Sequence, residues 1–332
     1  MDIDFVLPWV DGGDPAWRAE RARYAPEAAD GDASEVRYRD WGTLKYWFRG
    51  VDRFAPWVRR VHFITWGHLP EWLNAREPRL HIVRHEDYIP KEYLPTFSSH
   101  PIELNMHRIA GLADRFVYFN DDVFLTAPVT EEDFFKNGLP CDTCRFGVAH
   151  PHNTDDPFAH ILLNNTGVLN HCLNHRKYTR LNWRKWFSLR NGIKSVVRSV
   201  SLSYWPFFTG FVSPHLAVAY EKRAFEELWM AEPEALDATC RRRFRTMADV
   251  SQLAARSWRL ARGHFTPAKP LGVTFFLKSE YGARPAAQAI AAQRWRMVCV
   301  NDDDTGFDFE TERQRLIDAF ERILPNKCSF ER

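Results

Sequence analysis

Short hydrophobic runs of the kind that form buried strands recur along the first 120 residues of the chain. They lie at 3–7, 61–65, 80–83 and 116–119. Between them, hydrophobic residues recur at helical spacing over 43–54 and over 102–116. Strands that alternate with helices predict an α/β fold, with parallel strands and helices on both faces of the sheet.

The pattern changes after residue 150. Helices are predicted at 215–229 and 245–263, strands at 272–277 and 296–300, and a closing amphipathic helix at 309–324. We therefore expect three parts: an α/β core over 1–150, a mostly helical, basic insertion over 151–265, and strands and a helix over 266–332 that complete the core.

The stretch 157–220 contains no Asp or Glu but eight Lys and Arg residues, with tryptophans between them. One interpretation is a helical lobe with a solvated basic face. The other is a surface for an anionic partner: a phosphate-bearing polymer, a nucleotide or an acidic membrane. Because no recognition motif accompanies the charge and the net charge is only +2, we expect no nucleic-acid partner.

Composition and the absence of an evident targeting segment indicate in which cellular compartment the protein works. Hydrophobic residues make up 45% of the chain, which argues against disorder, and the six cysteines are scattered. Cys141 and Cys144 have ligand-like spacing but lack a second pair, so ordinary thiols are expected rather than zinc. No leader peptide or membrane-length apolar stretch is evident, which predicts a cytoplasmic protein, with the basic lobe as a candidate contact with the inner face of the membrane.

Acidic and amide side chains follow two of the predicted strands. Asn120, Asp121 and Asp122 come after the strand at 116–119, and Asn301 and Asp302, with two further aspartates, come after the strand at 296–300. Their oxygens suit Mg²⁺ or Mn²⁺, which would bridge to a diphosphate. A solvated turn explains one such motif, but its recurrence at a second strand end favours a metal site.

A turn after the first strand is a second candidate. Asp11, Gly12 and Asp14 lie where glycine lets a ligand approach the backbone, and an ordinary β-turn explains the same residues.

A helix predicted after Ser98 is a third candidate. On it, Glu103 and His107 share a face at i and i+4, with Arg108 beside them, and Ser99 stands at its start. The helix start would favour a phosphate; a capped helix with a local Glu–His ion pair is the alternative.

Two more groups complete the candidate chemistry. His215 lies at a predicted helix start, where the imidazole would stay neutral and act as a general base; Asp121 is the rival. Arg245 would stabilise a transferring phosphate through its fork of donors, although position alone does not distinguish it from its arginine neighbours.

Four ordered blocks of the chain resemble the Stealth family, the sugar-phosphate transferases of bacterial capsule synthesis. They are "IDFVLPWVDGGDPAW", the segments from "RYRDWGTLKYWFRG" to "FVYFNDDVFL", "SPHLAVAYEKRAFEELW" with "RTMADVSQLAARSWRLARG", and "VCVNDDD". The resemblance covers most of the chain.

The resemblance implies a Rossmann-like, GT-A-like nucleotide-sugar core. It also implies transfer of a hexose 1-phosphate, such as N-acetylglucosamine 1-phosphate, from a UDP-sugar to a hydroxyl of an anionic glycan, with release of UMP. Matching the family's motifs residue by residue implies functional roles for Arg49, Glu103, His107, Arg108, Asn120, Asp121, Asp122, His215, Arg245, Asn301 and Asp302.

The chain departs from the family pattern at Gly13, Pro101 and Ala110, each next to a proposed group, which leaves the donor sugar open. Two other functions compete. One is a metal-dependent glycosyltransferase that releases UDP, and the other is a non-catalytic polyanion-binding protein.

Overall fold

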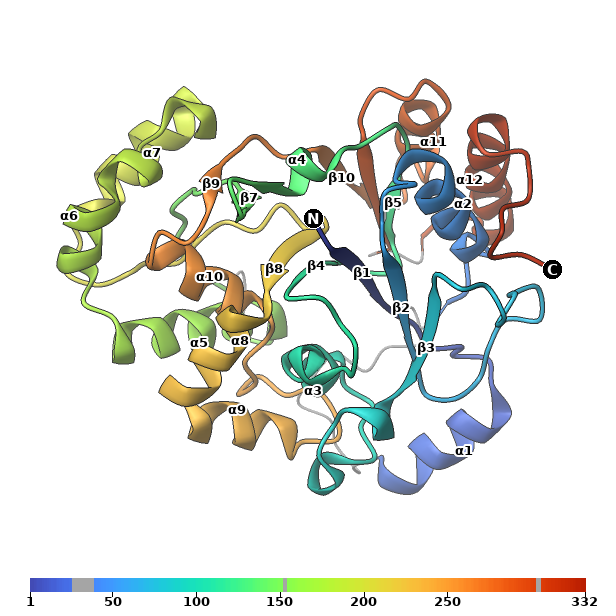
Figure 1. The fold of residues 1–332 in the computed structure, drawn as a ribbon, viewed down its shortest axis with the longest axis horizontal. Coiled ribbons are helices and arrows are strands. Elements are labelled where there is room, and N and C mark those ends of the chain that lie inside the picture. The colour runs from blue at the N-terminus through green and yellow to red at the C-terminus, as the bar shows by residue number, and fades with distance from the viewer. Residues whose placement is uncertain (26–38, 152–153, 303–305) are drawn as a thin grey trace.

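A five-stranded sheet forms the centre of the protein in the computed structural model, which describes residues 1–25, 39–151, 154–302 and 306–332. Its strand order is β3-β2-β1-β4-β8. The strands are β1 (Ile3–Pro8), β2 (Arg60–Thr65), β3 (Leu80–Arg84), β4 (Arg115–Tyr118) and β8 (Val218–Glu221). The first four are parallel, and β8 pairs antiparallel with β4 (Figure 1).

Both faces of this sheet are buried, which explains the continuous hydrophobic runs of its strands. Phe5 and Leu7 of β1 pack into one hydrophobic core, whereas Val6 packs into the other. The order β3-β2-β1-β4 is that of a Rossmann half, in which ligands bind beyond the carboxyl ends of the strands. The predicted α/β class is therefore confirmed.

A second sheet joins the C-terminal part of the chain to the centre. It has the order β10-β11-β5, formed by β10 (Gly272–Leu277), β11 (Met297–Asp302) and β5 (Val123–Leu125). Cys299 pairs with Val123, and the Val300 N–H donates to the main-chain oxygen of Asp122 at 2.9 Å. This pairing sets β11 directly beside the acidic end of β4.

Aromatic packing fixes the helices α2 (Leu44–Phe54) and α12 (Phe309–Ile323) in the first core. Tyr46 of α2 stacks on Phe320 of α12 at a centroid distance of 5.3 Å, and Phe320 also packs against Phe124. The predicted closing helix is thus confirmed as α12. Two further helices complete this part of the chain. Helix α1 (Pro15–Tyr24) follows β1, and helix α11 (Arg284–Ala291) precedes β11.

The middle of the chain supplies a largely helical region at one side of the sheet (Figure 1). Its helices are α5 (Pro157–Cys172), α6 (His175–Trp186), α7 (Ile193–Ser203), α8 (Lys222–Ala231), α9 (Pro233–Cys240) and α10 (Leu253–Ala261). Trp186 is buried and donates its indole N–H to the Leu260 carbonyl at 2.9 Å, which ties α6 to α10. A small third sheet contains β6 (Phe135–Lys136), β7 (Leu139–Asp142) and β9 (Thr266–Pro267), preceded by α4 (Glu131–Phe134).

Three predicted helices are shorter than the hydrophobic pattern indicated. The first is only α3 (Ser99–Leu104), followed by a 3-10 turn at Met106–Arg108. In the second, 218–221 form β8, because this Val-Ala-Tyr-Glu segment completes the edge of the buried sheet, and the helix begins at Lys222.

The third predicted helix begins only at Leu253. Ahead of it, the Asp249 carboxylate accepts from the Thr246 N–H at 3.0 Å and from the Thr246 hydroxyl at 2.9 Å, which fixes a turn instead. Within the described part of the chain, no helix has the length and apolar character needed to cross a bilayer.

Candidate active site

The segment 120–122 follows β4 of the central sheet and leads into β5 of the second sheet, so both sheets hold it in place. One carboxylate oxygen of Asp122, Oδ2, accepts from the Cys299 thiol at 3.3 Å. The other, Oδ1, is buried and has no hydrogen-bond partner among the residues that the structure describes. A buried, unpaired carboxylate oxygen is costly, so it favours a cation at this place.

His215 lies against this acidic segment. Its Nε2 is 3.2 Å from Asn120 Nδ2 and 3.5 Å from Asp122 Oδ2. The Thr274 hydroxyl of β10 donates to the main-chain oxygens of Pro214 and His215, which anchors the loop that carries the imidazole. The predicted helix start at His215 is wrong, since β8 follows it; the loop and β10 position the imidazole instead.

Tyr118 and Glu103 extend this cluster on the inner side. The Tyr118 hydroxyl lies 2.6 Å from Asn120 Oδ1 and 3.0 Å from Glu103 Oε1, and both Tyr118 and Glu103 are buried. Contact with the phenol orients the Asn120 amide so that its nitrogen faces His215. Sequence reasoning did not identify Tyr118; the available signal was a phenol in a buried strand just before the acidic motif.

Asp121 is the most perturbed carboxyl group of the cluster. The protein surrounding it and the like charge of Asp122 raise the pKa of Asp121 to about 7, although water still reaches its exposed side chain; Arg245 opposes the shift. A carboxyl group with such a pKa is typical of functional sites.

The donor set fits a hard cation. Ligand atoms of Asp122, His215 and Cys299 all lie within 4.8 Å of one another. Burial, followed by the charge of Asp122, raises the pKa of the Cys299 thiol far above its usual range, and the thiol donates to Asp122 Oδ2. A hard cation prefers oxygen ligands, and the unpaired Oδ1 of Asp122 is the first candidate.

β11 presents its two predicted metal ligands to opposite faces. Asn301 shares the face of Cys299, beside Asp122, because side chains alternate along a strand. Asp302 points to the other face, where both oxygens accept from Arg39, at 2.8 and 3.1 Å, and Oδ2 also accepts from Trp41. The two aspartates that follow, at 303 and 304, lie outside the described residues.

Ser99 and Arg245 lie in direct contact. If both bind the same phosphate, as predicted, they must be neighbours. Arg245 Nη2 donates to the Ser99 hydroxyl at 2.7 Å. The segment of Arg245 is fixed by Asp249, which contacts the buried His100 at 3.0 Å and Arg242 at 3.1 Å. Asp249 therefore fixes the loop of Arg245.

Three other predicted residues have contacts elsewhere. His107 stacks on Phe225, and burial lowers its pKa to about 4; it does not share a helix face with Glu103, because α3 ends at Leu104. Arg108 lies over the Trp229 ring, and all three guanidinium nitrogens of Arg49 are engaged by the C-terminal segment.

The turn after β1 contains the remaining candidates. Asp11 Oδ1 accepts from the Gly13 N–H at 2.8 Å, and Asp14 caps α1 by accepting from the Trp17 N–H at 2.8 Å. The Asp11 N–H donates to His68 Nε2 at 2.7 Å. Because β1 and β4 are adjacent and parallel, this turn and the acidic segment follow the same edge of the sheet.

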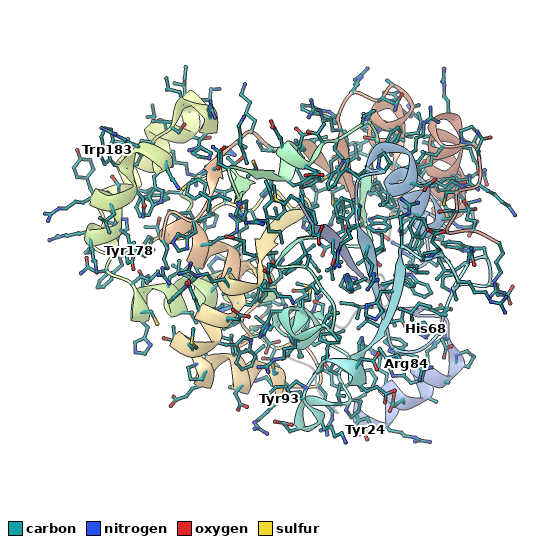
Figure 2. All side chains as sticks on the ribbon, in the orientation of Figure 1. Tyr24, His68, Arg84, Tyr93, Tyr178 and Trp183 are labelled. Atoms are coloured by element: carbon teal, nitrogen blue, oxygen red, sulfur yellow. The ribbon has the colours of Figure 1, made fainter. Side chains whose placement is uncertain are left out.

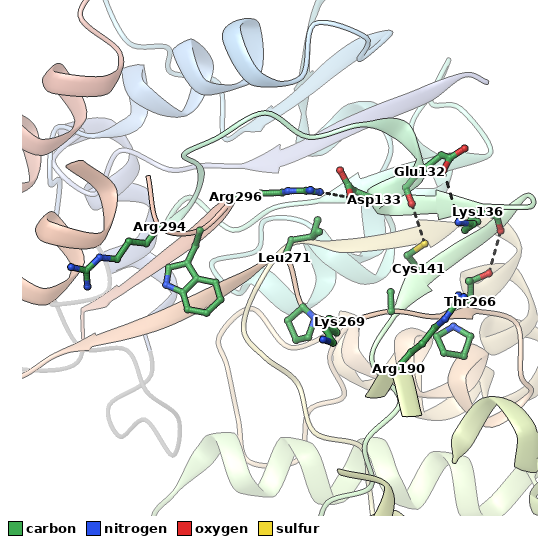
Figure 3. Close-up of a pocket in the computed structure, with 14 residues that line it drawn as sticks. Glu132, Asp133, Lys136, Cys141, Arg190, Thr266, Lys269, Leu271, Arg294 and Arg296 are labelled. Carbon is green, nitrogen blue, oxygen red and sulfur yellow. Dashed lines mark hydrogen bonds and ion pairs between the residues drawn. The ribbon is translucent and has the colours of Figure 1, made fainter. Parts of the chain in front are cut away.

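A separate cavity of about 540 Å³ lies where β11 begins, at the opposite end of this strand from Asn301 and Asp302 (Figure 3). Asp133 and Glu132 in its wall are paired with Arg296 and Lys136. Arg190, Lys269, Arg294 and the half-exposed Trp295 also line it, and none of these three basic residues forms an ion pair with a described carboxylate.

Comparison with known proteins places the chain in a family. The description "Stealth protein CR1, conserved region 1" matches residues 1–27, and "Stealth protein CR2, conserved region 2" matches residues 37–141. A capsular polysaccharide phosphotransferase, WcwK of Streptococcus pneumoniae, is 38% identical over 100% of this chain and 99% of its own length. The chain belongs to the Stealth family.

Other relatives are similar over comparable lengths. The receptor polysaccharide phosphotransferase WefC of Streptococcus gordonii is 36% identical over 99% of this chain and 98% of its own. The exopolysaccharide phosphotransferase cps2G of Lactiplantibacillus plantarum is 35% identical over 100% and 97%. The family expected from the four sequence blocks is confirmed.

Among solved structures, the galactosyltransferase LgtC, in complex with donor and acceptor sugar analogues, is 10% identical with a TM-score of 0.37, covering 95% of both chains. The bifunctional glycosyltransferase WbbM has a TM-score of 0.38 at 10% identity, covering 97% of this chain and 51% of its own. The fold class rests on the strand order described above.

Proposed function

We propose that this Stealth protein is a sugar-1-phosphate transferase of capsular or exopolysaccharide synthesis. The observation that carries the proposal is the cluster of Asn120, Asp121, Asp122 and His215 at the carboxyl end of β4. It combines a place for a cation with two candidate bases. Relatives that match the chain over its whole length are named polysaccharide phosphotransferases, which supports the same reaction class.

In this reaction a hydroxyl oxygen of the acceptor glycan attacks the β-phosphorus of a UDP-sugar, such as UDP-N-acetylglucosamine. A new P–O bond forms, and the bond from the β-phosphorus to the bridging oxygen breaks, so that UMP leaves with that oxygen. The hydroxyl proton moves to a base on the protein. The product is a phosphodiester between the sugar and the acceptor, with the anomeric carbon untouched.

Asp122 and Asn301 are the proposed ligands of Mg²⁺ or Mn²⁺, because both present oxygen donors on the same side of β11. When bound, such an ion would neutralise charge on the diphosphate. Asp302 can join them only by leaving Arg39 and Trp41.

His215 is the proposed base for the acceptor proton. Its Nε2 contacts Asn120 and Asp122, which holds the imidazole beside the acidic segment. Asp121 is the rival base, since it is exposed to water in the same cluster.

Donor phosphates are proposed to bind between Arg245 with Ser99 and the turn of Asp11, Gly12 and Asp14. The guanidinium supplies fixed positive charge where negative charge moves during transfer. Asn120 and Glu103 support the site through Tyr118. Roles for Arg49, His107 and Arg108 in substrate binding stay predictions, which substitution can test.

An anionic acceptor is proposed to extend into the basic cavity of Arg190, Lys269 and Arg294, where Trp295 can stack on a sugar ring. Because such contacts are electrostatic, acceptor affinity should fall as ionic strength rises. The proposed compartment is the cytoplasm, where UDP-sugars are made. The proposed division of the chain has three parts, with boundaries at residues 150 and 265.

The nucleotide released from UDP-N-acetylglucosamine tests the reaction class. Purified protein is incubated with the donor, Mg²⁺ or Mn²⁺ and a panel of glycans, and UMP and UDP are separated. Acceptor-dependent UMP is expected. Acceptor-dependent UDP would instead mean attack at the anomeric carbon, that is, an ordinary glycosyltransferase, and failure to bind any nucleotide sugar would favour a polyanion-binding protein.

A further inference from the structure

Helix α7 presents its apolar side to solvent. Ile193, Val197, Val200 and Tyr204 follow one another at i, i+4, i+7 and i+11 and so form one stripe. Ile193, Val197 and Tyr204 are 72%, 62% and 82% exposed. We call this stripe the α7 face.

The opposite side of α7 packs against the protein through two serines and Leu202, which is partly buried against the hydrophobic core that contains Val6. Ser195 and Ser199 are the buried residues of the helix, and the Ser199 hydroxyl accepts from the Phe146 N–H at 3.1 Å. A helix of a globular protein ordinarily buries its apolar stripe and exposes its polar one. Most of the apolar residues of α7 therefore face solvent while two of its serines are buried, which indicates that another apolar surface covers the α7 face.

Large apolar residues continue beyond the helix. Leu189 precedes it, Trp205 and Phe207 follow it, and Leu181 and Trp183 lie on α6; all five are exposed. Figures 1 and 2 show α6 and α7 at the outer edge of the molecule, with the Trp183 side chain pointing away from the body. An apolar surface of this extent marks an interaction site in a soluble protein.

The charges around the α7 face indicate what kind of partner covers it. Lys194 and Arg198 border the α7 face, Arg190 lies just before it, and no Asp or Glu occurs over 157–220. In a symmetric contact with a second copy, these cations would face one another and repel. A dissolved polyanion would satisfy the cations but leave the apolar stripe in water. An anionic bilayer satisfies both.

We propose that the α7 face, with Trp205 and Phe207, inserts into the interface of an anionic membrane while Lys194 and Arg198 contact lipid phosphates. Helices with an apolar stripe, flanking cations and neighbouring aromatics bind membranes in this orientation. This inference does not depend on the reaction proposed above.

Co-sedimentation of the full-length protein with vesicles tests it. Vesicles of phosphatidylcholine alone are compared with vesicles that also contain phosphatidylglycerol, at low and high salt. We expect binding to the phosphatidylglycerol vesicles, weakened by salt, and about a tenfold loss of affinity in Val197→Asp and in Tyr204→Asp. The matched control is Met230→Asp, at an exposed apolar residue of α8, which should bind like the unchanged protein.

Circular dichroism establishes that each variant is folded. If one of the two variants fails to fold, the other still tests the proposal. Three results would overturn the proposal: no binding to either kind of vesicle, unchanged binding in both folded variants, or a dimer in light scattering that Val197→Asp dissociates. UMP release with a water-soluble acceptor should be unchanged in the variants, so loss of membrane binding is distinguishable from failure of the proposed reaction.

Discussion

His215 Nε2 lies 3.5 Å from Asp122 Oδ2, which joins the loop before β8 to the acidic end of β4. Asp122 follows β4 and His215 precedes β8, and the antiparallel pairing of these two strands brings the two segments together. This relationship places the proposed base beside the proposed cation site, and it gives the first prediction.

Replacing His215 with Ala should slow UMP release by about 10²–10⁴-fold, because a positioned base is worth that much. His215 is partly exposed, so the thermal unfolding midpoint should change little. His160→Ala, on α5, serves as the matched control and should keep full activity. Full activity in His215→Ala would exclude His215 as the base and leave Asp121, to be tested by Asp121→Asn.

Asp122→Asn should weaken Mn²⁺ binding by at least about tenfold, because one charged oxygen ligand is lost. Electron paramagnetic resonance of bound Mn²⁺ measures this without any turnover. Glu86→Gln, at an exposed carboxylate, is the control. Asp302→Asn separates the two faces of β11: unchanged Mn²⁺ binding is expected, and a loss as large as that of Asp122→Asn would show that Asp302 is a ligand.

Arg245→Ala should lower kcat/KM for the UDP-sugar by about 10²–10³-fold, since a fixed donor to transferring charge is removed. Arg243 provides the neighbouring control: it lies over the Tyr24 ring, and Arg243→Ala should leave kcat/KM within a factor of about two. Equal losses in both variants would mean that the basic segment acts through its overall charge.

Arg49→Ala should destabilise the fold by about 3–5 kcal/mol, because the buried Glu331 carboxylate would lose its partner. Urea unfolding measures the change. If Arg49 has the structural role that its contacts indicate, KM for the donor stays constant in the fraction that is folded. A raised KM at unchanged stability would support the substrate-binding role that the family motif implies.

Acid should destabilise the protein through Asp4. Burial alone would raise the pKa of Asp4, but hydrogen bonds from His62, Arg59 and the Ala113 N–H lower it to about 2. A depressed carboxyl pKa stabilises the fold above the unfolded value of 3.8, and that contribution is lost as pH falls toward 2.

For a shift of this size the contribution is about 2 kcal/mol. Urea unfolding of Asp4→Asn should therefore show a smaller loss of stability between pH 5 and pH 2 than the unchanged protein. Parallel curves for the two proteins would contradict this account.

Much of the fold could be predicted from sequence because buried strands and amphipathic helices leave simple periodic patterns. The runs at β1, β2, β3 and β4 are mostly hydrophobic because both faces of the sheet are covered, and the polar Asp4 and His62 within them are buried as a hydrogen-bonded pair. β8 was missed because 218–221 continue into a helix, and only pairing with β4 makes them a strand. Local pattern does not encode that partner.

The candidate site was predictable where polar residues interrupt a hydrophobic run, as at 120–122. Position relative to a strand also predicts Asn301 as a ligand; β11 does run beside Asp122, since the Val300 N–H donates to the Asp122 main-chain oxygen, and the role of Asn301 stays a prediction. Side-chain direction and long-range contacts were not encoded locally, so Asp302, Arg49 and His107 were grouped with the site although their partners lie elsewhere.

The fate of the β-phosphorus is the most direct test of the proposed reaction. UDP-N-acetylglucosamine labelled with ³²P at the β-position is incubated with the protein, a divalent cation and a glycan acceptor, and the label is followed. The account predicts that ³²P enters the glycan in a phosphodiester while unlabelled UMP is released. Label that remains in UDP while the glycan gains unlabelled sugar would contradict it.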